Sequence, residues 1–296
     1  MIYGKIGGIL LKKLLVADYD NTLYTDEISL LKNINKIKEF RKLGNYFAIS
    51  TSRGYTSLMN EIEKYKIPYD FICTNNGAVI SNNKGKIIYK NFLNIEDFNK
   101  IEKVLENYYN IEITRYYLNS IKIQNKEKST NNYDIVPDEI IGYKIKGNIE
   151  ILNAIKKSFE IILNNFEISI KENKKLFLNS KKNTKEKAIK QLLKEITLNY
   201  QLSSLSSEKI MVYTVGDDDV DFGMLKNYNG FRMEKSSELL MKNIKKSTKS
   251  VEELINYIEN WNQMWDFLGR EFGKFLRRDF GVGDKNHGCT ILNKNN

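Results

Sequence analysis

The stretch LLVADYDNTLYTDE, residues 14–27, decides the fold of this chain. An apolar run, LLVA, leads directly into Asp18 and Asp20, and Asn21 and Thr22 follow. Burying a carboxylate costs free energy unless the charge is paired or hydrogen-bonded, so carboxylates at the end of a buried segment need a purpose. A short apolar run bounded by turn residues is typical of a strand in a buried parallel sheet. We therefore interpret residues 13–20 as a buried strand with carboxylates at its end.

Strand-like and helix-like patterns alternate around this stretch. The segments are helix 29–44, strand 45–51, helix 53–67 and the start of a strand within 70–80; later, helix 184–200, strand 209–217 and helix 250–265 follow. Gly44 and Pro68 end the first two helices, as C-terminal signals do. This alternation predicts an α/β fold with a doubly wound, Rossmann-like parallel sheet.

The segment 83–181 follows a different pattern. Strand-like stretches outnumber helix-like ones there, which suits an antiparallel sheet with helices on one face. We predict that it is an inserted α+β domain, and that residues 1–82 and 182–262 form the core domain. The tail, 263–296, has aromatic residues at roughly helical spacing before a Gly- and Asn-rich end, so we expect a helix followed by disorder.

Composition argues against several classes of protein. Hydrophobic residues make up 41% of the 296 residues, which is enough for a sizeable core. The chain has two cysteines, Cys73 and Cys289, and one histidine, His287, so a disulfide scaffold, a zinc site or a Ser-His-Asp triad is not expected. Lysines interrupt the apolar residues near the N-terminus, and we predict neither a signal peptide nor a membrane span. A cytoplasmic location is the expectation.

The formal net charge of +10 would suit a nucleic-acid partner. However, lysine is spread over every segment and alternates with glutamate, and no arginine-rich block stands out. We therefore predict neither a nucleic-acid nor a membrane partner; retention on DNA or RNA that falls steeply with salt would indicate otherwise. The aromatic residues of the tail are expected to pack on the core or to support self-association as a homodimer.

Polar residues follow several predicted strands at the edge where open parallel sheets bind ligands. Asp18 and Asp20 follow the first strand and Thr51 the second, an acidic run from Asp217 to Asp221 follows the strand at 209–217, and Lys185 begins the preceding helix. Several carboxylates without histidine point to Mg²⁺, which prefers oxygen ligands. Mg²⁺ beside a nucleophilic carboxylate is an arrangement for phosphoryl transfer through an acyl phosphate. A second carboxylate can then serve as general acid and base.

These stretches resemble the motifs of the haloacid dehalogenase (HAD) superfamily, and most closely those of Cof-type sugar phosphatases with a C2-type cap inserted after the third strand. The matches are DYDNTLYT to Asp-x-Asp-x-Thr, ISTSR to Thr-Gly-Arg, TNNGA to Asn-Gly-Ala, NTKEKAIKQL to Lys-Gly-x-Ala-Leu, and VGDDDVDFGML to Gly-Asp-x-x-Asn-Asp. The resemblance covers about residues 13–260. Five motifs in this order, around an insertion of suitable size, are far more specific than any one of them.

The resemblance implies catalytic roles. Asp18 would be the nucleophile, and Asp20 the general acid and base. Thr22 would fix the loop that aims Asp20, Thr51 would bind the transferring phosphoryl group, and Lys185 would neutralise nucleophile and phosphate together.

It also implies a magnesium site and contacts to the substrate. Asp18, Asp217 and the main-chain carbonyl of Asp20 would hold Mg²⁺, and Asp221 would support the metal shell. Arg53 either contacts the substrate phosphate or is an ordinary surface residue of the helix. Asn76 either hydrogen-bonds at the junction between core and cap or only shapes a turn.

The chain departs from the family pattern at three positions. Val220 stands where asparagine is usual, so Asp218 or Asp219 compensates or the metal is held more loosely. Ser52 and Glu186 replace glycines. Lys181, Lys182 and Lys187 lie close enough in sequence to leave open which lysine is catalytic.

We therefore predict a Mg²⁺-dependent phosphomonoester hydrolase that acts on a small sugar phosphate, with substrate choice set by the inserted cap. Two alternatives remain open from sequence. One is a phosphomutase or phosphotransferase that uses the same aspartyl phosphate, and the other is a non-catalytic binding protein on this scaffold.

Overall fold

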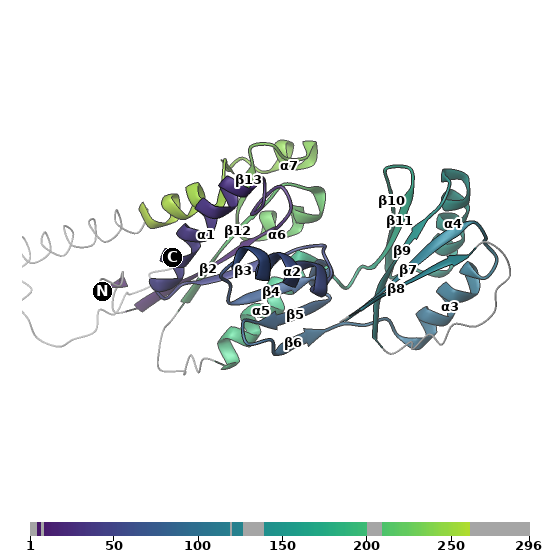
Figure 1. Ribbon diagram of the computed structural model, residues 1–296. Helices are drawn as coiled ribbons and strands as arrows, with labels where there is room; N and C mark the ends of the chain where they lie inside the picture. Colours follow the sequence, from purple (N-terminus) through teal and green to yellow (C-terminus); the bar gives the residue numbers. More distant parts are fainter. Residues whose placement is uncertain (1–4, 7–8, 119, 127–138, 200–208, 261–296) are drawn as a thin grey trace, which may run out of the picture.

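The computed structural model describes residues 5–6, 9–118, 120–126, 139–199 and 209–260, which form two sheets that lie side by side (Figure 1). The predicted tail, 263–296, lies outside the described residues. Within the described part, no helix combines the length and the apolar character that crossing a membrane requires.

The larger sheet has nine strands, and the DYDNT stretch follows its central strand. The strands are β1 (Lys5–Ile6), β2 (Ile9–Ala17), β3 (Tyr46–Ser50), β4 (Phe71–Thr74), β5 (Val79–Asn82), β6 (Ile87–Lys90), β12 (Lys209–Gly216), β13 (Asn229–Met233) and β14 (Ser247–Thr248). They are ordered β14-β13-β12-β2-β3-β4-β5-β6, with β1 beside β2. The strands from β14 to β4 are parallel. The predicted doubly wound α/β fold is confirmed.

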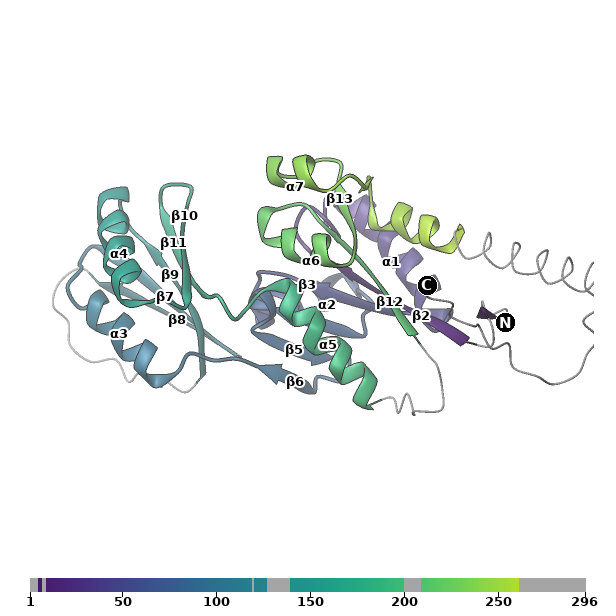
Figure 2. The ribbon, with the colours of Figure 1, turned by 180° about the vertical axis from the view of Figure 1, so that it is seen from behind.

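Helices cover both faces of this sheet. They are α1 (Glu27–Lys42), α2 (Tyr55–Tyr65), α5 (Lys185–Asn199), α6 (Phe222–Asn227), α7 (Glu238–Asn243) and a helix at 251–260. Alternate residues of β2 point to opposite faces, so Leu15 packs with α1, α2 and the helix 251–260, whereas Leu14 and Val16 pack with α5, α6 and α7. Figures 1 and 2 show the two helical layers from opposite sides. Burial on both faces explains the unbroken apolar run in the sequence.

The chain reverses direction inside the stretch 70–80. Asn75, Asn76 and Gly77 have φ values of 51°, 56° and 92°, and they form a short 3₁₀ turn between β4 and β5. Strand β5 therefore runs antiparallel to β4, and β6 extends the same sheet. The predicted domain boundary at residue 82 is thus too early, because it falls inside the β5–β6 hairpin.

The second sheet has five antiparallel strands and is formed by the segment predicted as the insertion. Its strands are β7 (Ile111–Tyr117), β8 (Ile121–Lys126), β9 (Ile140–Lys146), β10 (Phe166–Lys171) and β11 (Lys175–Ser180), in the order β10-β11-β9-β7-β8. Helices α3 (Ile95–Leu105) and α4 (Ile149–Ile162) pack on one face through an apolar cluster. In Figure 1 both helices lie on the side away from the larger sheet. The opposite face of this sheet is turned towards the larger sheet.

We expect Gly77→Ala to lower the free energy of unfolding by about 3 kcal/mol. Gly77 has a φ of +92°, and an added Cβ would lie 2.5 Å from Cβ of Ala188 on α5. Left-handed backbone costs an ordinary residue about 1 kcal/mol, and overpacking adds about 2 kcal/mol. Urea denaturation measures the loss.

The matched control for this substitution is Gly85→Ala. Gly85 also has a left-handed φ of +75°, but an added Cβ would meet nothing within 4 Å. It should cost only about 1 kcal/mol. Equal losses of unfolding free energy in the two variants would show that the close approach of Ala188 to the added Cβ does not contribute.

Candidate active site

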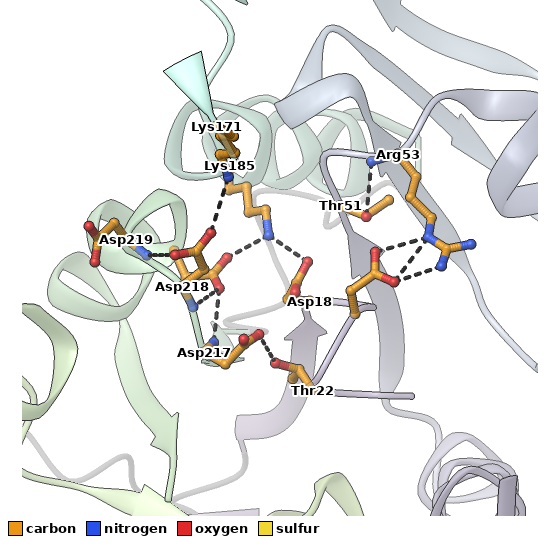
Figure 3. Close-up of polar contacts among 11 residues, drawn as sticks. Asp18, Thr22, Thr51, Arg53, Lys171, Lys185, Asp217, Asp218 and Asp219 are labelled. Atoms are coloured by element: carbon orange, nitrogen blue, oxygen red, sulfur yellow. Dashed lines mark hydrogen bonds and ion pairs between the residues drawn. The ribbon is translucent and has the colours of Figure 1, made fainter. Parts of the chain in front are cut away.

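The loops that follow four strands of the larger sheet meet at one edge. Asp18 directly follows β2, Thr51 follows β3, Asn75 follows β4 and Asp217 follows β12. Because these strands are parallel neighbours, their carboxyl ends lie at the same edge, where open α/β sheets bind ligands. The motifs that are dispersed in the sequence are therefore brought together (Figure 3).

Lys185 lies at the centre of this edge, between two carboxylates. Its Nζ atom is 2.5 Å from Oδ1 of Asp18 and 2.5 Å from Oδ1 of Asp221 (Figure 3). The exposed fraction is 2% for Lys185, 6% for Asp18 and 0% for Asp221. The ammonium arrives from the first residue of α5, so its position depends on how α5 packs against the sheet.

The neighbouring lysines point elsewhere. Lys187 donates a hydrogen bond to the main-chain carbonyl of Lys181, and Lys181 donates one to the carbonyl of Asn164. Lys181, Lys182 and Lys187 are exposed. Of these four lysines, Lys185 is therefore the one that the fold brings to the carboxylates.

Burial and charge act in opposition on this cluster. Burial raises the pKa of Asp18 to about 7. The charge of Lys185 lowers this pKa, but the nearby charge of Asp221 raises it and so partly cancels the effect of Lys185. For Lys185, burial lowers the pKa, but the charges of Asp221 and Asp18 outweigh it, so the pKa lies above its ordinary value. The ammonium therefore stays charged, and a further cation near Asp18 would favour the carboxylate form of that residue.

Asp221 is held by the main chain as well as by Lys185. Its Oδ2 atom accepts hydrogen bonds from the N–H groups of Asp217, at 2.9 Å, and Asp218, at 3.1 Å. A Cβ on Gly216 would lie 2.5 Å from the Asp221 carboxyl carbon, so only glycine fits at that position. Both oxygens of Asp221 are thus engaged within the protein.

The carboxylates of Asp18, Asp217 and Asp221 form one cluster, in which ligand atoms lie within 4.8 Å of one another. Thr22 is buried and donates a hydrogen bond of 2.8 Å from Oγ1 to Oδ1 of Asp217. Thr22 therefore positions Asp217 in this structure. The hydroxyl links the loop after β2 to the loop after β12.

Asp20 is turned away from this cluster and towards Arg53. The Arg53 guanidinium donates from Nη2 to Oδ1 of Asp20 at 2.6 Å and from Nε to Oδ2 at 2.9 Å. Arg53 also lies 4.8 Å from the ring centre of Tyr19 and 3.4 Å from Glu61. The Asp20 side chain is 46% exposed, so it borders the open part of the site.

Thr51 and Asn76 lie on the β3–β4 side of the site. Oγ1 of Thr51 accepts a hydrogen bond from the N–H of Arg53, and the main-chain carbonyl of Thr51 accepts one from the N–H of Asn76. Thr51 is buried, whereas Asn76 lines the larger of two cavities at the site. The left-handed turn at Asn76 is what brings the β4–β5 connection to Thr51.

Two cavities meet at this edge. The smaller one, of about 400 Å³, is lined by Asp18, Asp20, Lys185 and Asp217. The larger one, of about 600 Å³, lies between the loops of the larger sheet and the uncovered face of the five-stranded sheet. Ser52, Asp218 and Val220 line both cavities, so the two are contiguous.

Val220 presents an apolar side chain, 40% exposed, to both cavities at the position where an asparagine is usual in the motif. The Asp218 carboxylate, two residues earlier, contacts Asp219 and Lys171. Its side chain accepts a hydrogen bond from the N–H of Asp219, and it lies 3.6 Å from Nζ of Lys171 at the end of β10 (Figure 3). This ion pair joins the two sheets across the larger cavity.

Sequence reasoning did not single out Lys171, Lys235 or Ser236. Lys171 lines the larger cavity, and Lys235 and Ser236 line the smaller one. The sequence offers one weak signal for Lys235 and Ser236, which is that they closely follow the apolar strand residues of β13. Lys171 is not distinguishable by sequence from the many other lysines of the chain.

The sequence model of the haloacid dehalogenase-like hydrolases matches residues 15–256 of this chain. This match covers most of the chain, so the protein belongs to that family and the predicted family and hydrolase class are confirmed. The chain is also similar to an uncharacterized protein of Mycoplasma capricolum, with 29% identity over 248 residues that make up 73% of this chain and 88% of the relative.

Solved structures share the same fold. A haloacid dehalogenase-like hydrolase from Bacteroides thetaiotaomicron has a TM-score of 0.64 at 21% identity, covering 83% of this chain and 99% of its own. One from B. subtilis has a TM-score of 0.64 at 17% identity, with coverages of 84% and 99%. A HAD subclass IIB sugar phosphatase has a TM-score of 0.59 at 17% identity, with coverages of 84% and 99%. At these identities the similarity concerns the fold.

We expect Lys185→Met to lower the free energy of unfolding by about 4 kcal/mol in buffer with EDTA. The substitution removes the ammonium and leaves the buried carboxylates of Asp18 and Asp221 without a counter-charge, a change that costs about 3–5 kcal/mol. Urea denaturation gives the value. Lys187→Met is the control, since this exposed lysine on the same helix should change stability by about 0.5 kcal/mol or less. Similar losses in both variants would contradict a central role for Lys185.

Proposed function

We propose that this hydrolase is a Mg²⁺-dependent phosphomonoesterase that forms a phosphoaspartate on Asp18, with a small sugar phosphate as its substrate. The observation that carries the proposal is the contact of one buried ammonium, Lys185, with both Asp18 and Asp221 beside an open cavity. A carboxylate can act as a nucleophile on phosphorus only if it is ionised and its charge is compensated. Lys185 supplies part of that compensation.

The residues around Asp18 suit a hard divalent cation. Their donors are carboxylate oxygens, which Mg²⁺ prefers. Lys185 contacts one oxygen of Asp18 and Thr22 contacts one oxygen of Asp217, so each carboxylate has a second oxygen that can serve as a ligand. Both oxygens of Asp221 are occupied by the protein, so Asp221 supports the site and is not expected to bind the metal directly. When bound, Mg²⁺ would reduce the repulsion between Asp18 and the phosphate and stabilise oxyanion charge.

The chemistry proceeds in two displacements at phosphorus. An oxygen of Asp18 bonds to phosphorus while the bond from phosphorus to the ester oxygen breaks. Asp20, after leaving Arg53 and taking up a proton from water, gives that proton to the departing oxygen. Asp20 then takes a proton from the water that attacks the phosphoaspartate. Orthophosphate leaves, and Asp18 is regenerated. Thr51, on the β3 side, is the proposed hydrogen-bonding partner of the transferring phosphoryl group.

Arg53 has a positioning role in this scheme. It holds the Asp20 carboxylate by three hydrogen bonds, so Asp20 must leave this pair to reach the ester oxygen. Asp20 is partly exposed and lines the smaller cavity, which allows that movement. Arg53 itself lines the larger cavity, where it would then face the bound substrate.

The larger cavity suits the non-phosphate part of a sugar phosphate. Its volume of about 600 Å³ is in the range of small-molecule sites. The uncovered face of the five-stranded sheet contributes the rings of Tyr116 and Phe177 and the polar groups of Ser169 and Asn179. Gly142 is paired with Tyr116 in the sheet and has no side chain, so it leaves room in the cavity beside the Tyr116 ring. Aromatic surfaces combined with hydroxyl and amide groups can bind a polyhydroxylated ring.

We propose that the segment forming this sheet is a cap domain that selects the substrate. The ion pair between Lys171 and Asp218 joins it to the loop after β12. The subclass IIB sugar phosphatase with the same fold agrees with this assignment. A cytoplasmic location, a homodimer and the lack of nucleic-acid and membrane partners stay predictions from sequence.

The test is phosphate release from p-nitrophenyl phosphate and a panel of sugar phosphates, with Mg²⁺ and with EDTA. We expect turnover that needs Mg²⁺ and is reduced by at least about a thousandfold in Asp18→Asn, because an amide cannot form the phosphoaspartate. Glu63→Gln is the control, because it removes an exposed carboxylate of α2 that lines neither cavity, and it should stay within about twofold of wild type.

Each outcome has a clear meaning. Equal turnover with Mg²⁺ and with EDTA would contradict the proposed need for a metal. Normal turnover in Asp18→Asn would contradict the role of Asp18 as the nucleophile. No release of phosphate from any compound, by folded protein with Mg²⁺, would favour transfer to another acceptor or binding alone.

A further inference from the structure

Residues 235–237 border the smaller cavity, as does Ser52 of the loop after β3. In the sheet order β13-β12-β2-β3, Thr51 follows β3 on one side of β2, and residues 234–237 follow β13 on the other side. Lys235, Ser236 and Ser237 line the cavity together with Asp18 and Lys185. A group bound over Asp18 would therefore be flanked by the β3 loop and by this segment.

Hydrogen bonds fix the segment at the site. The N–H of Ser237 donates to the main-chain carbonyl of Asp217 at 2.8 Å, which ties the segment to the carboxylate cluster. The N–H of Glu234 donates to the carbonyl of Thr248 at 3.0 Å, and the guanidinium of Arg232 donates to the carbonyl of Glu234 at 3.3 Å. Lys235 thus sits on a backbone that is anchored on both sides.

Lys235 differs from the other cations of the site in its partners. Lys185 is occupied by Asp18 and Asp221, and Arg53 by Asp20 and Glu61. Lys235 is exposed and, among the described residues, forms no ion pair with a carboxylate. Its positive charge is therefore available to a ligand in the cavity.

The neighbouring hydroxyl points to the same conclusion. Oγ of Ser236 is buried and has no hydrogen-bond partner within the described part of the chain. Buried polar atoms are usually hydrogen-bonded, so an unpaired hydroxyl at a cavity wall calls for a ligand or a water molecule. Lys235 and Ser236 together offer a cation and a hydroxyl, which are the groups that bind phosphate oxygens.

The balance of charge at the site also requires a further cation. Asp18, Asp217 and Asp221 carry three negative charges against the one positive charge of Lys185, and one divalent cation would cancel the remainder. Asp20 is already neutralised by Arg53, and Asp218 by Lys171. A phosphomonoester dianion would then enter a site without net positive charge.

We infer that Lys235, assisted by the hydroxyl of Ser236, binds the non-bridging oxygens of the transferring phosphoryl group from the β13 side. The inference rests on the proposed phosphatase function, because it names a second phosphate-binding element of the same site. Lys185 then serves Asp18 and Asp221, whereas Lys235 serves the phosphate.

The test measures binding of inorganic phosphate by calorimetry in the presence of Mg²⁺, without turnover. Lys235→Ala should raise the Kd for phosphate about tenfold, as expected for the loss of one charge-assisted hydrogen bond. Lys235→Arg should retain most of the affinity, since it keeps the charge. Lys242→Ala is the control, because it removes the same charge from an exposed lysine of α7 that lines neither cavity.

Kinetics give a second readout. If Lys235 binds the phosphoryl group equally in the ground state and the transition state, Lys235→Ala raises KM and the inhibition constant for phosphate while kcat changes little. The KM of wild type should rise with salt more steeply than the KM of Lys235→Ala, since salt screens exposed charges. The Mg²⁺ concentration for half-maximal activity should stay the same.

Two results would overturn the inference. One is an unchanged Kd for phosphate in Lys235→Ala, and the other is an equal loss in Lys242→Ala. In the first case, tighter Mg²⁺ binding in Lys235→Ala would show that Lys235 competes with the metal. If wild type hydrolyses no phosphomonoester but binds phosphate through Lys235, the proposed function fails, and only the binding of a phosphate group by Lys235 is retained.

Discussion

The structure depends on the burial of one ammonium between two carboxylates. Lys185, Asp18 and Asp221 are nearly or fully excluded from water, and each charge would be costly to bury alone. The two contacts of 2.5 Å offset the free-energy cost of burying these charges. The contacts form only if α5, the loop after β2 and the loop after β12 keep their relative positions. The sheet order β12-β2 and the packing of α5 on these strands provide that geometry.

This constraint explains the local details around the cluster. Asp221 must approach the main chain closely enough to accept hydrogen bonds from Asp217 and Asp218, and this approach leaves no room for a Cβ on Gly216. Thr22 fixes Asp217 from the other side. With Asp221 held in this way, Val220 is left at the cavity wall without a part in supporting the carboxylates. Replacement of the usual asparagine by valine is thus compatible with an intact cluster.

The two sheets divide the work at the proposed site. The larger sheet supplies the charged residues through loops at its carboxyl edge, whereas the five-stranded sheet supplies a mostly neutral surface across the larger cavity. The helices α3 and α4 leave one face of the smaller sheet uncovered, so that face is available to a ligand. Charge is therefore concentrated where phosphate would bind, and shape is provided where the rest of a substrate would lie.

The sequence by itself determined the α/β class, the strand that ends in Asp18 and the family. These features are local: an apolar run, the spacing of motif residues and the order of segments along the chain are all visible in one dimension. Tertiary structure decided which lysine reaches Asp18, because 181–187 offers four of them and only the docking of α5 separates Lys185 from its neighbours. It also decided that Asp20 pairs with Arg53, that the sheet continues through β6, and that Lys235 borders the same cavity as Asp18. Such contacts join residues far apart in sequence, and they arise from strand order and helix packing, which no single segment encodes.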